Sequence, residues 1–458
     1  MGPDSYPGNG PAGEGIISWL FGGEGYAPSR VRGLYGGSLW LEPSFHGQQW
    51  LNSRTGIGVS GMLWIDSGYE TIKRDNPRTV DSAMTLQQGR GVLRLTPAYV
   101  NGRFFIQGQV ELVGNLCQAS NNGDQFSTLP NPVCQGAGTF DTDDLWIRVG
   151  HRDLWDLQIG RFQGWEVYHT GMGLEPYTLE RLGAGMFGST QPSQHQLDVP
   201  SLDAVNYLHD RPSDGLAVGY AALHAYFTKW LRLELLAKLG TDGYRGDASL
   251  APGHDPSGPA TYYGGRPTLI FDMGWLKLKL AGAYQKRTPI SQELGDIGNQ
   301  VTGKKDPVEG TVQKSASAAI QVVVDPYFEF GFNAGIGEQD ATGSWATSDP
   351  DYTFTTKSVG GFGNFRLSED WLVGLGGNWS TWTDGYKADT STATNYSSEL
   401  QAFVAVQYLL ARRLYIKAVL DYATAELQPS APFVQDDYST YAWHNHLYGG
   451  RIRLMYIF

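Results

Sequence analysis

Few residues in this sequence stand at the spacing that catalysis or metal binding requires. His444 and His446 are two residues apart and would share one face of a strand, but a metal site needs three or four ligands. The sequence contains no Gly-Xaa-Ser-Xaa-Gly turn for a nucleophilic serine and no phosphate-binding loop with its lysine. We therefore expect no enzyme activity, no catalytic residues, no metal and no cofactor.

The two cysteines, Cys117 and Cys134, lie in one polar stretch rich in glycine and asparagine. A disulfide between them would close a short loop and stabilise the fold by about 3 kcal/mol, because it restricts the unfolded chain. Such a bond needs an oxidising compartment such as the bacterial periplasm. A free pair in a reducing compartment is the alternative.

Charged residues alternate with apolar residues along many short segments. In residues 231–239 the odd positions are all leucine or alanine, whereas the even positions include Arg232, Glu234 and Lys238. Residues 276–280 repeat the pattern, with lysines between leucines. Side chains of a strand point alternately to its two faces, so each segment predicts a strand with one apolar and one charged face.

These segments are joined by connections of two very different lengths. Short turns such as Asn101-Gly102 join the strands of a pair, and long polar connectors such as 163–204 and 384–396 join successive pairs. Short turns at one end and long loops at the other are typical of outer-membrane barrels. The sequence therefore predicts an all-β fold: a transmembrane antiparallel β-barrel of 16 strands, with short periplasmic turns and long extracellular loops.

The composition agrees with this architecture. Glycine accounts for 60 of the 458 residues and aromatic residues for 13%, while charged residues make up only 17%. This combination favours many twisted strands with tight turns, and aromatic rings at a boundary between water and lipid. The net charge of −12 argues against a nucleic-acid partner.

The beginning of the chain does not follow the hairpin pattern. Residues 1–30 are rich in glycine and proline, and their apolar run 16–21 is too short for the core of a signal peptide. Residues 35–45 alternate weakly and could form an additional strand. We divide the chain into residues 1–58, a periplasmic extension or plug-like segment that could contact a periplasmic or envelope partner, and residues 59–458, the barrel.

The last strand carries a resemblance to a known class. Ile452, Leu454, Tyr456 and Phe458 share one parity, and the sequence stops on an aromatic residue. This closely resembles the C-terminal signal of outer-membrane β-barrels. The resemblance implies that Tyr456 and Phe458 form an assembly signal read by the barrel-assembly machinery. It also implies an outer-membrane location, surrounded by lipid and lipopolysaccharide.

Residues 105–111, 144–150 and 157–162 resemble the third to fifth strands of Gram-negative porins. The nearest relatives suggested by these segments are the phosphate-selective and related 16-strand trimeric porins. The resemblance implies a homotrimer without enzymatic activity.

In porins the third long loop folds into the barrel and narrows it, and connector 163–204 is the third long loop here. The resemblance therefore implies a constriction loop, in which Glu175, Glu180 and Arg181 line the bore. An outward lid is the alternative.

The strand parity predicts which charged side chains face the bore. Basic candidates exceed acidic ones, although the whole chain is acidic. The predicted pore-lining residues are Arg94, Arg148, Arg161, Arg232, Lys238, Lys277, Lys279, Arg366, Lys417, Arg451, Arg453, Glu111 and Glu234.

The function expected from these features is a porin for passive diffusion of small hydrophilic solutes, with a mild preference for anions. A barrel that serves as an anchor or export channel in a larger envelope complex is the alternative, because a plain porin needs little sequence before its first strand. A barrel enzyme is a third hypothesis, and the sequence offers no convergent catalytic set for it.

Overall fold

The computed structural model describes most of the strands and the short connections between them. The described residues are 48–74, 82–122, 140–162, 164, 218–228, 230–242, 260–273, 275–289, 310–324, 327–342, 352–368, 370–388, 391–411, 414–428 and 443–458. Every regular element within these ranges is a β-strand. None of the described residues forms a helix that is long and apolar enough to cross a membrane.

The strands follow one another along the chain with few interruptions. Their bounds are β1 Gln48–Trp50, β2 Thr55–Arg74, β3 Ser82–Asn101, β4 Phe104–Asn122, β5 Phe140–His151, β6 Trp155–Arg161, β7 Val218–Tyr226, β8 Leu231–Asp242, β9 Ala260–Asp272, β10 Leu276–Pro289, β11 Gly310–Val324, β12 Phe328–Thr342, β13 Tyr352–Arg366, β14 Trp371–Ala388, β15 Ser391–Ala411, β16 Leu414–Gln428 and β17 Trp443–Ile457.

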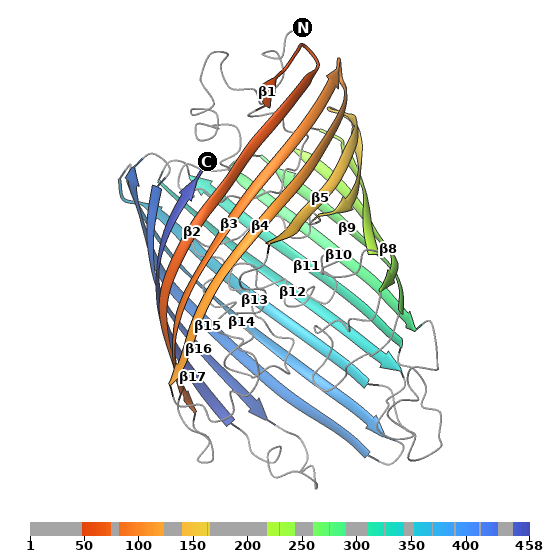
Figure 1. Ribbon diagram of the computed structural model, residues 1–458. Coiled ribbons are helices and arrows are strands. Elements are labelled where there is room, and N and C mark those ends of the chain that lie inside the picture. Colours follow the sequence, from red (N-terminus) through yellow and green to blue (C-terminus); the bar gives the residue numbers. More distant parts are fainter. Residues whose placement is uncertain are drawn as a thin grey trace.

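Strands β2 to β17 form a closed antiparallel barrel (Figure 1). Each strand pairs with the next along the chain, and β17 pairs with β2, which closes the circle of 16 strands. The prediction of a 16-strand antiparallel barrel is therefore confirmed. The first barrel strand begins at Thr55 rather than at residue 59, and the short strand β1 pairs with β2 in addition.

Two polar stretches, one of them the predicted connector 384–396, are partly strand in the structure. β14 and β15 continue through most of 384–396 and pair as far as Ala388 with Ser391. β4 likewise runs to Asn122, so the backbone of Cys117 lies on a strand rather than in a loop. These segments are polar, and hydropathy gives no strand signal there because both faces of a strand beyond the lipid can contact water.

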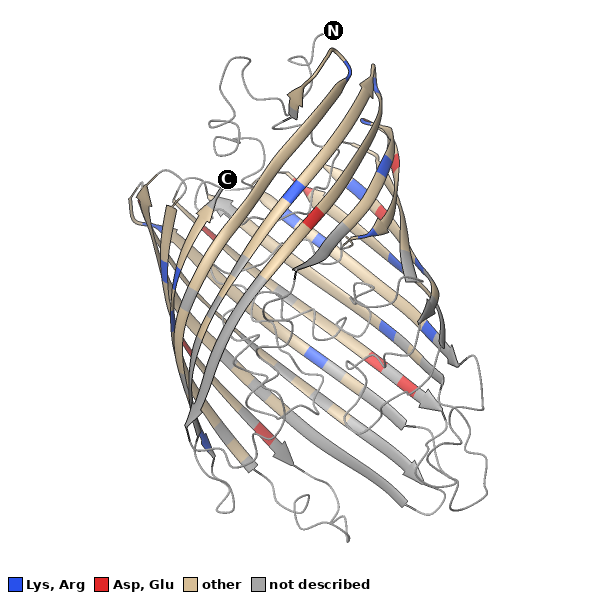
Figure 2. Cartoon of the chain, in the orientation of Figure 1, with Lys and Arg blue, Asp and Glu red and all other residues tan. Residues whose placement is uncertain are grey.

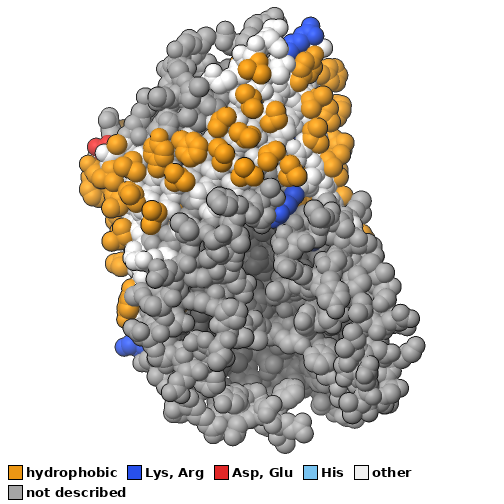
Figure 3. Space-filling model, viewed as in Figure 1, with side chains coloured by type: hydrophobic (Ala, Val, Ile, Leu, Met, Phe, Trp, Pro, Cys, Tyr) orange, Lys and Arg blue, Asp and Glu red, His pale blue; other side chains and the backbone are white. Residues whose placement is uncertain are grey.

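The alternation predicted from the sequence separates the two faces of the wall. Leu280 is 57% exposed on the outer face, whereas its neighbour Lys279 is fully buried on the inner face. Leu235 and Glu234 on β8 show the same contrast. On the face seen in Figure 3, many hydrophobic side chains gather on the described part of the outer wall, as a lipid-facing surface requires.

Exposed aromatic side chains mark two levels on the outer wall. The level beside the short turns includes Phe104, Trp155, Phe227, Trp275, Tyr327 and Trp371, and the level toward the other end includes Tyr69, Tyr284, Trp379 and Tyr448. Trp275 and Tyr284 lie nine residues apart, which is about 30 Å along a strand and about 23 Å after a tilt near 40°. This matches the ~25 Å apolar band of outer-membrane barrels, flanked by its two aromatic girdles.

The closing seam depends on the last residue of the chain. Gly61 N–H donates to the Phe458 carbonyl over 2.8 Å, and Phe458 N–H donates to the Gly61 carbonyl over 2.9 Å. A side chain at position 61 would overlap the Phe458 ring and the Val92 carbonyl oxygen. The glycine therefore allows the terminal aromatic ring to lie directly against β2.

Position 280 tests the orientation and depth of the wall. Replacing Leu280, which lies between the two aromatic levels, with arginine places a charge near the middle of the bilayer and should cost about 2–4 kcal/mol of unfolding free energy. Urea titration of the barrel in lipid vesicles measures this cost. The Ala316→Arg variant is the matched control, because it is also outward-facing but close to the second aromatic level, and should cost at most about 1 kcal/mol. Equal costs at the two positions would contradict the assigned depth.

A substitution at Gly61 tests whether the terminal aromatic ring stabilises the closing seam. Gly61→Ala should lower the unfolding free energy by about 1–3 kcal/mol, because the new methyl group overpacks the contact with Phe458 and Val92. Gly265→Ala serves as the control, since the nearest atom to a Cβ there is 3.9 Å away. Thermal melting of both variants in detergent compares them. A Gly61→Ala variant as stable as Gly265→Ala would show that the terminal ring does not tighten the seam.

Candidate functional site

The inner wall of the barrel is the candidate site, because charged side chains gather there at low exposure. Figure 2 shows basic and acidic positions along the strands around the barrel. The basic residues described on the inward parity are Arg94, Arg148, Arg232, Lys238, Arg266, Lys277, Lys279, Arg366, Lys417, Arg451 and Arg453. The acidic ones are Glu111, Asp156, Glu234, Asp272, Glu329 and Asp421. Basic side chains therefore outnumber acidic ones on the described inner wall.

The structure places the predicted pore-lining residues on this wall with two qualifications. Arg366 lies on the inward parity but at the short-turn end, where its Nε donates to the Ser368 carbonyl over 3.1 Å. Arg161 stands directly opposite Leu145, which is exposed on the outer face. Arg161 thus lies on the outward parity, contrary to the prediction, because it shares that parity with the exposed Ile159. That these residues line a solute path stays a prediction.

Several other predicted residues lie outside the description. Glu175, Glu180 and Arg181 of the expected constriction loop fall outside the described residues, and so does Cys134. The side chain of Cys117 is not described either, so the disulfide stays a prediction. Tyr456 and Phe458 lie at the seam with their rings stacked and the ring centroids 6.2 Å apart. Their role as an assembly signal stays a prediction.

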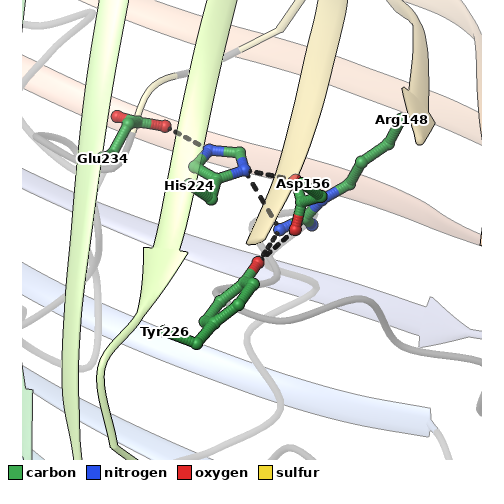
Figure 4. Close-up of polar contacts among 5 residues, drawn as sticks. All are labelled: Arg148, Asp156, His224, Tyr226 and Glu234. Carbon is green, nitrogen blue, oxygen red and sulfur yellow. Dashed lines mark hydrogen bonds and ion pairs between the residues drawn. The ribbon is translucent and has the colours of Figure 1, made fainter. Parts of the chain in front are cut away.

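The most tightly connected part of the inner wall is a row of charged residues across β5 to β8. His224 on β7 stands directly opposite Asp156 on β6 and Glu234 on β8. Its Nδ1 lies 2.6 Å from Asp156 Oδ1, and its Nε2 lies 2.8 Å from Glu234 Oε2. All three side chains are fully buried. Figure 4 shows the imidazole ring held between the two carboxylates.

Arg148 and Tyr226 complete the row from either side of Asp156. Arg148 Nε donates to Asp156 Oδ1 over 2.5 Å, and its Nη2 donates to the Tyr226 hydroxyl over 2.5 Å. The Tyr226 hydroxyl in turn donates to the other Asp156 oxygen. In Figure 4 three donors therefore converge on one carboxylate. Arg148 Nη2 and His224 Nδ1 are 3.2 Å apart because both are directed at Asp156.

The row brings two carboxylates against an arginine and a histidine. Asp156 accepts hydrogen bonds from Arg148 and Tyr226, and each ring nitrogen of His224 lies within hydrogen-bond distance of one carboxylate. Such pairing is what allows ionisable groups to lie together away from water.

Among the described strands of the barrel, the row lies at the shortest ladder. β6 has seven residues, and its described pairing with β7 runs from Trp155–Ala225 to Gly160–Tyr220. Gly150 allows the close packing, since a side chain there would overlap the backbone and Cβ of Asp156. The row therefore joins the side chains of four strands where the described backbone pairing is shortest.

Other inward charges are arranged in smaller groups. Arg94 forms an ion pair with Glu111, and Lys277 lies 3.3 Å from Asp272. Glu329 accepts hydrogen bonds from Gln321 over 2.7 Å and from Asn364 over 2.8 Å. On the β16–β17 side, Arg453 lies over the ring of Trp64, 4.2 Å from its centroid, a cation–π contact.

The sequence analysis missed Asp156, His224, Tyr226 and Arg266. The sequence could have predicted which face they lie on, since Tyr220, His224 and Tyr226 alternate with small and apolar residues of β7. Their hydrogen-bond partners could not be predicted, because more than fifty residues separate β6 from β7 and no local pattern sets the register between the two strands. Among the described residues, no group of three or more candidate ligands could hold a metal ion.

A double-mutant cycle tests whether the row stabilises the barrel wall. Asp156→Leu alone should cost about 3–5 kcal/mol of unfolding free energy, because it leaves Arg148 and His224 buried without their shared carboxylate. Arg148→Met in the same chain should recover part of that loss, with a coupling energy of about 0.5–3 kcal/mol. Urea titrations of the single and double variants measure it. The exposed pair of Lys314 and Glu338, 3.0 Å apart, is the control and should show little coupling. Additive costs at 148 and 156 would mean that the row does not stabilise the wall.

Comparison with known proteins adds solved structures of the same architecture. No protein-family model matches the sequence, and no curated protein is similar enough in sequence to be recognised as a relative. One similar structure is the outer membrane channel DcaP of Acinetobacter baumannii, at 10% identity and a TM-score of 0.49, covering 90% of this chain and 100% of that one. Another is the OprB structure from Pseudomonas putida, at 11% identity and a TM-score of 0.49, covering 87% and 94%.

An anion-selective porin from Comamonas acidovorans is similar at 10% identity and a TM-score of 0.47, covering 88% of this chain and 100% of that one. Likenesses at this level supply no residue roles and no substrate. The fold rests on the chain's own geometry: a closed ring of 16 antiparallel strands, an apolar outer wall and two aromatic girdles. The chain therefore has the porin-like fold of an outer-membrane β-barrel and resides in the outer membrane.

Proposed function

We propose that this protein is a channel for the passive diffusion of small hydrophilic solutes, with a preference for anions. The observation that carries the proposal is the basic excess among the inward charges described above. It contrasts with a net charge of −12 for the whole chain. The mechanism requires no chemistry and no cofactor, only a bore of fixed charge and width.

The acidic groups of the inner wall support the preference for anions because several are matched by cations of the wall itself. Asp156 is paired with Arg148, and Glu111 is paired with Arg94. The basic excess then determines the field that a passing solute meets. Fixed charges act strongly within about one Debye length, ~8 Å in physiological salt, so wall charges outweigh charges on distant loops.

The pair Lys277 and Lys279 is the sharpest place to test this function. Both face inward and are nearly fully buried on β10, while Lys314 on the adjacent strand β11 is exposed on the outer face. Changing both inward lysines to glutamate alters the wall by four charges, so reversal potentials in a salt gradient should move toward cation selectivity.

The control for this experiment is Lys314→Glu, which should leave the reversal potential almost unchanged. A larger effect of Lys314→Glu than of the inward double change would place the selective element outside the bore. Planar-bilayer recordings measure both. Complete silence of every variant, with co-purifying envelope proteins, would instead support the anchor or export function.

One observation favours the alternative function as an anchor or export channel. β1 and the residues before it add sequence ahead of the first barrel strand, and β1 is joined to the sheet through β2. An envelope partner at this end would fit a barrel that anchors a larger complex.

We also propose three partners for the folded barrel. The terminal aromatic residues at the seam suit recognition by the barrel-assembly machinery. The ion-paired cluster of Lys314, Glu338 and Asp340 lies on the outer face beyond the aliphatic band and suits contact with lipopolysaccharide head groups. The third proposed partner is further copies of this chain in a homotrimer, and the mass in mild detergent tests it.

A further inference from the structure

The histidine pair of the last strand, His444 and His446, has no role in the diffusion channel. Both residues share the face of β17 that carries the exposed Tyr448 and Ile452, so they lie on the outer wall. Tyr448 belongs to the aromatic level away from the short turns. The two histidines lie beyond it, about 5 and 10 Å further along the barrel axis after the strand tilt. This is the level of the lipid head groups.

Polar groups from both neighbouring strands surround the pair, since β16, β17 and β2 lie side by side at the seam (Figure 1). Lys73 on β2 is exposed and stands directly opposite His446. On β16 the Tyr422 hydroxyl lies 3.0 Å from His446 Nδ1, and Glu426 stands opposite His444. These are the titratable groups that the described parts of the two strands present to the pair. We call the five residues the histidine patch.

The charge of the histidine patch changes with pH. Lys73 and Glu426 cancel each other, so the patch becomes net positive when the histidines are protonated. Histidine is the side chain whose charge ordinarily changes between pH 5 and 8. The rings of His444 and His446 stack with their centroids 4.5 Å apart, and two imidazolium ions at this distance repel each other. An anion beside the rings removes that repulsion, so the patch attracts anions more strongly in acid.

One polar atom of the patch points to such a ligand. His444 Nε2 is shielded from water, yet it forms no hydrogen bond with any residue that the structure describes. A shielded polar atom without a partner costs free energy, and such an atom in a folded protein requires an explanation. A phosphate oxygen beside the rings would accept a hydrogen bond from this nitrogen when it carries a proton.

The wall between the patch and the middle of the bilayer is apolar. Leu420 on β16 is 71% exposed and Ile452 on β17 is 56% exposed, both on the outer face. Gly450 stands opposite Leu420, and a Cβ at position 450 would be only 3.2 Å from the Leu420 side chain. Leu420 therefore covers the gap that the glycine leaves. A lipid with a phosphate at the head-group level and acyl chains below matches both surfaces, whereas free phosphate matches only the patch.

We propose that the histidine patch binds a phosphate group of lipopolysaccharide in the outer leaflet, and that acid strengthens this binding. Lys73 supplies the permanent positive charge, and His444 and His446 supply the charge that appears on acidification. The acyl chains of the same lipid lie along Leu420 and Ile452. The proposal rests on the proposed lipopolysaccharide partner and adds a second, pH-dependent contact to it. It does not depend on the channel function.

Binding of diphosphoryl lipid A to the full chain in detergent tests the patch, with native mass spectrometry as the measurement. The full chain should bind about fivefold more tightly at pH 5.5 than at pH 7.5. The double variant His444→Gln, His446→Gln should lose this pH dependence. Lys73→Gln should weaken binding about threefold at both pH values. Arg103→Gln is the matched control, because the Arg103 side chain is 72% exposed at the short-turn end, and it should change neither affinity.

The outcomes separate this site from the general lipopolysaccharide contact. Binding by the full chain that does not change with pH, or a double variant that keeps the pH dependence, would overturn the patch and leave the contact at Lys314 standing. A folded, heat-modifiable full chain that binds no lipid A at either pH would overturn both. Displacement of the lipid by an excess of inorganic phosphate would show a free-anion site and also overturn the proposal. If the double variant does not fold, Lys73→Gln and the pH dependence of the full chain decide.

Discussion

The pairing of both edges of β2 is the constraint on which the rest of this structure depends. No water is present in the hydrocarbon to satisfy unpaired backbone groups, so a sheet in a membrane must close on itself. β17 closes it here, but it ends opposite Gly61 while β2 begins six residues earlier at Thr55. β1 pairs with the part of β2 that β17 leaves uncovered. The terminal ring, the glycine beneath it and the short first strand are therefore parts of one closure.

Once the sheet is closed, the alternation of side chains separates an outward face, which meets lipid, from an inward face, which does not. Outward positions meet lipid and hold leucine, isoleucine and phenylalanine between two aromatic levels. Inward positions are released from that requirement and can hold charge. The wall uses this freedom in two ways: the row around His224 joins the short strands β6 and β7, and the inward charges taken together carry a basic excess that includes Lys277 and Lys279 on β10.

Parity was the part of this structure that the sequence could predict well. The segments 231–239 and 276–280 showed which side chains face inward, because one apolar face per strand is a strong and local signal. Arg161 shares its parity with the exposed Ile159, and that parity would have placed it on the outward side rather than among the pore-lining residues. The strand character of 384–396 was missed since water-facing strands need no apolar pattern. The partners of His224 depend on register across a long connector, and no local pattern encodes that register.

Two features of the inner wall, its basic excess and its apolar clusters, depend on the closure of the barrel. A basic excess predicts how ions are distributed in the bore, and its effect is short-ranged because salt screens it within about 8 Å. The apolar clusters at the short-turn end predict that water does not fill that part of the wall, because buried apolar area is the main favourable term in folding. Trp50 of β1 packs against the cluster of Ala98, Val100 and Phe105. Because β1 pairs with the uncovered part of β2 and also packs Trp50 against the inward cluster, the closure of the wall and the apolar lining at its short-turn end involve the same short strand.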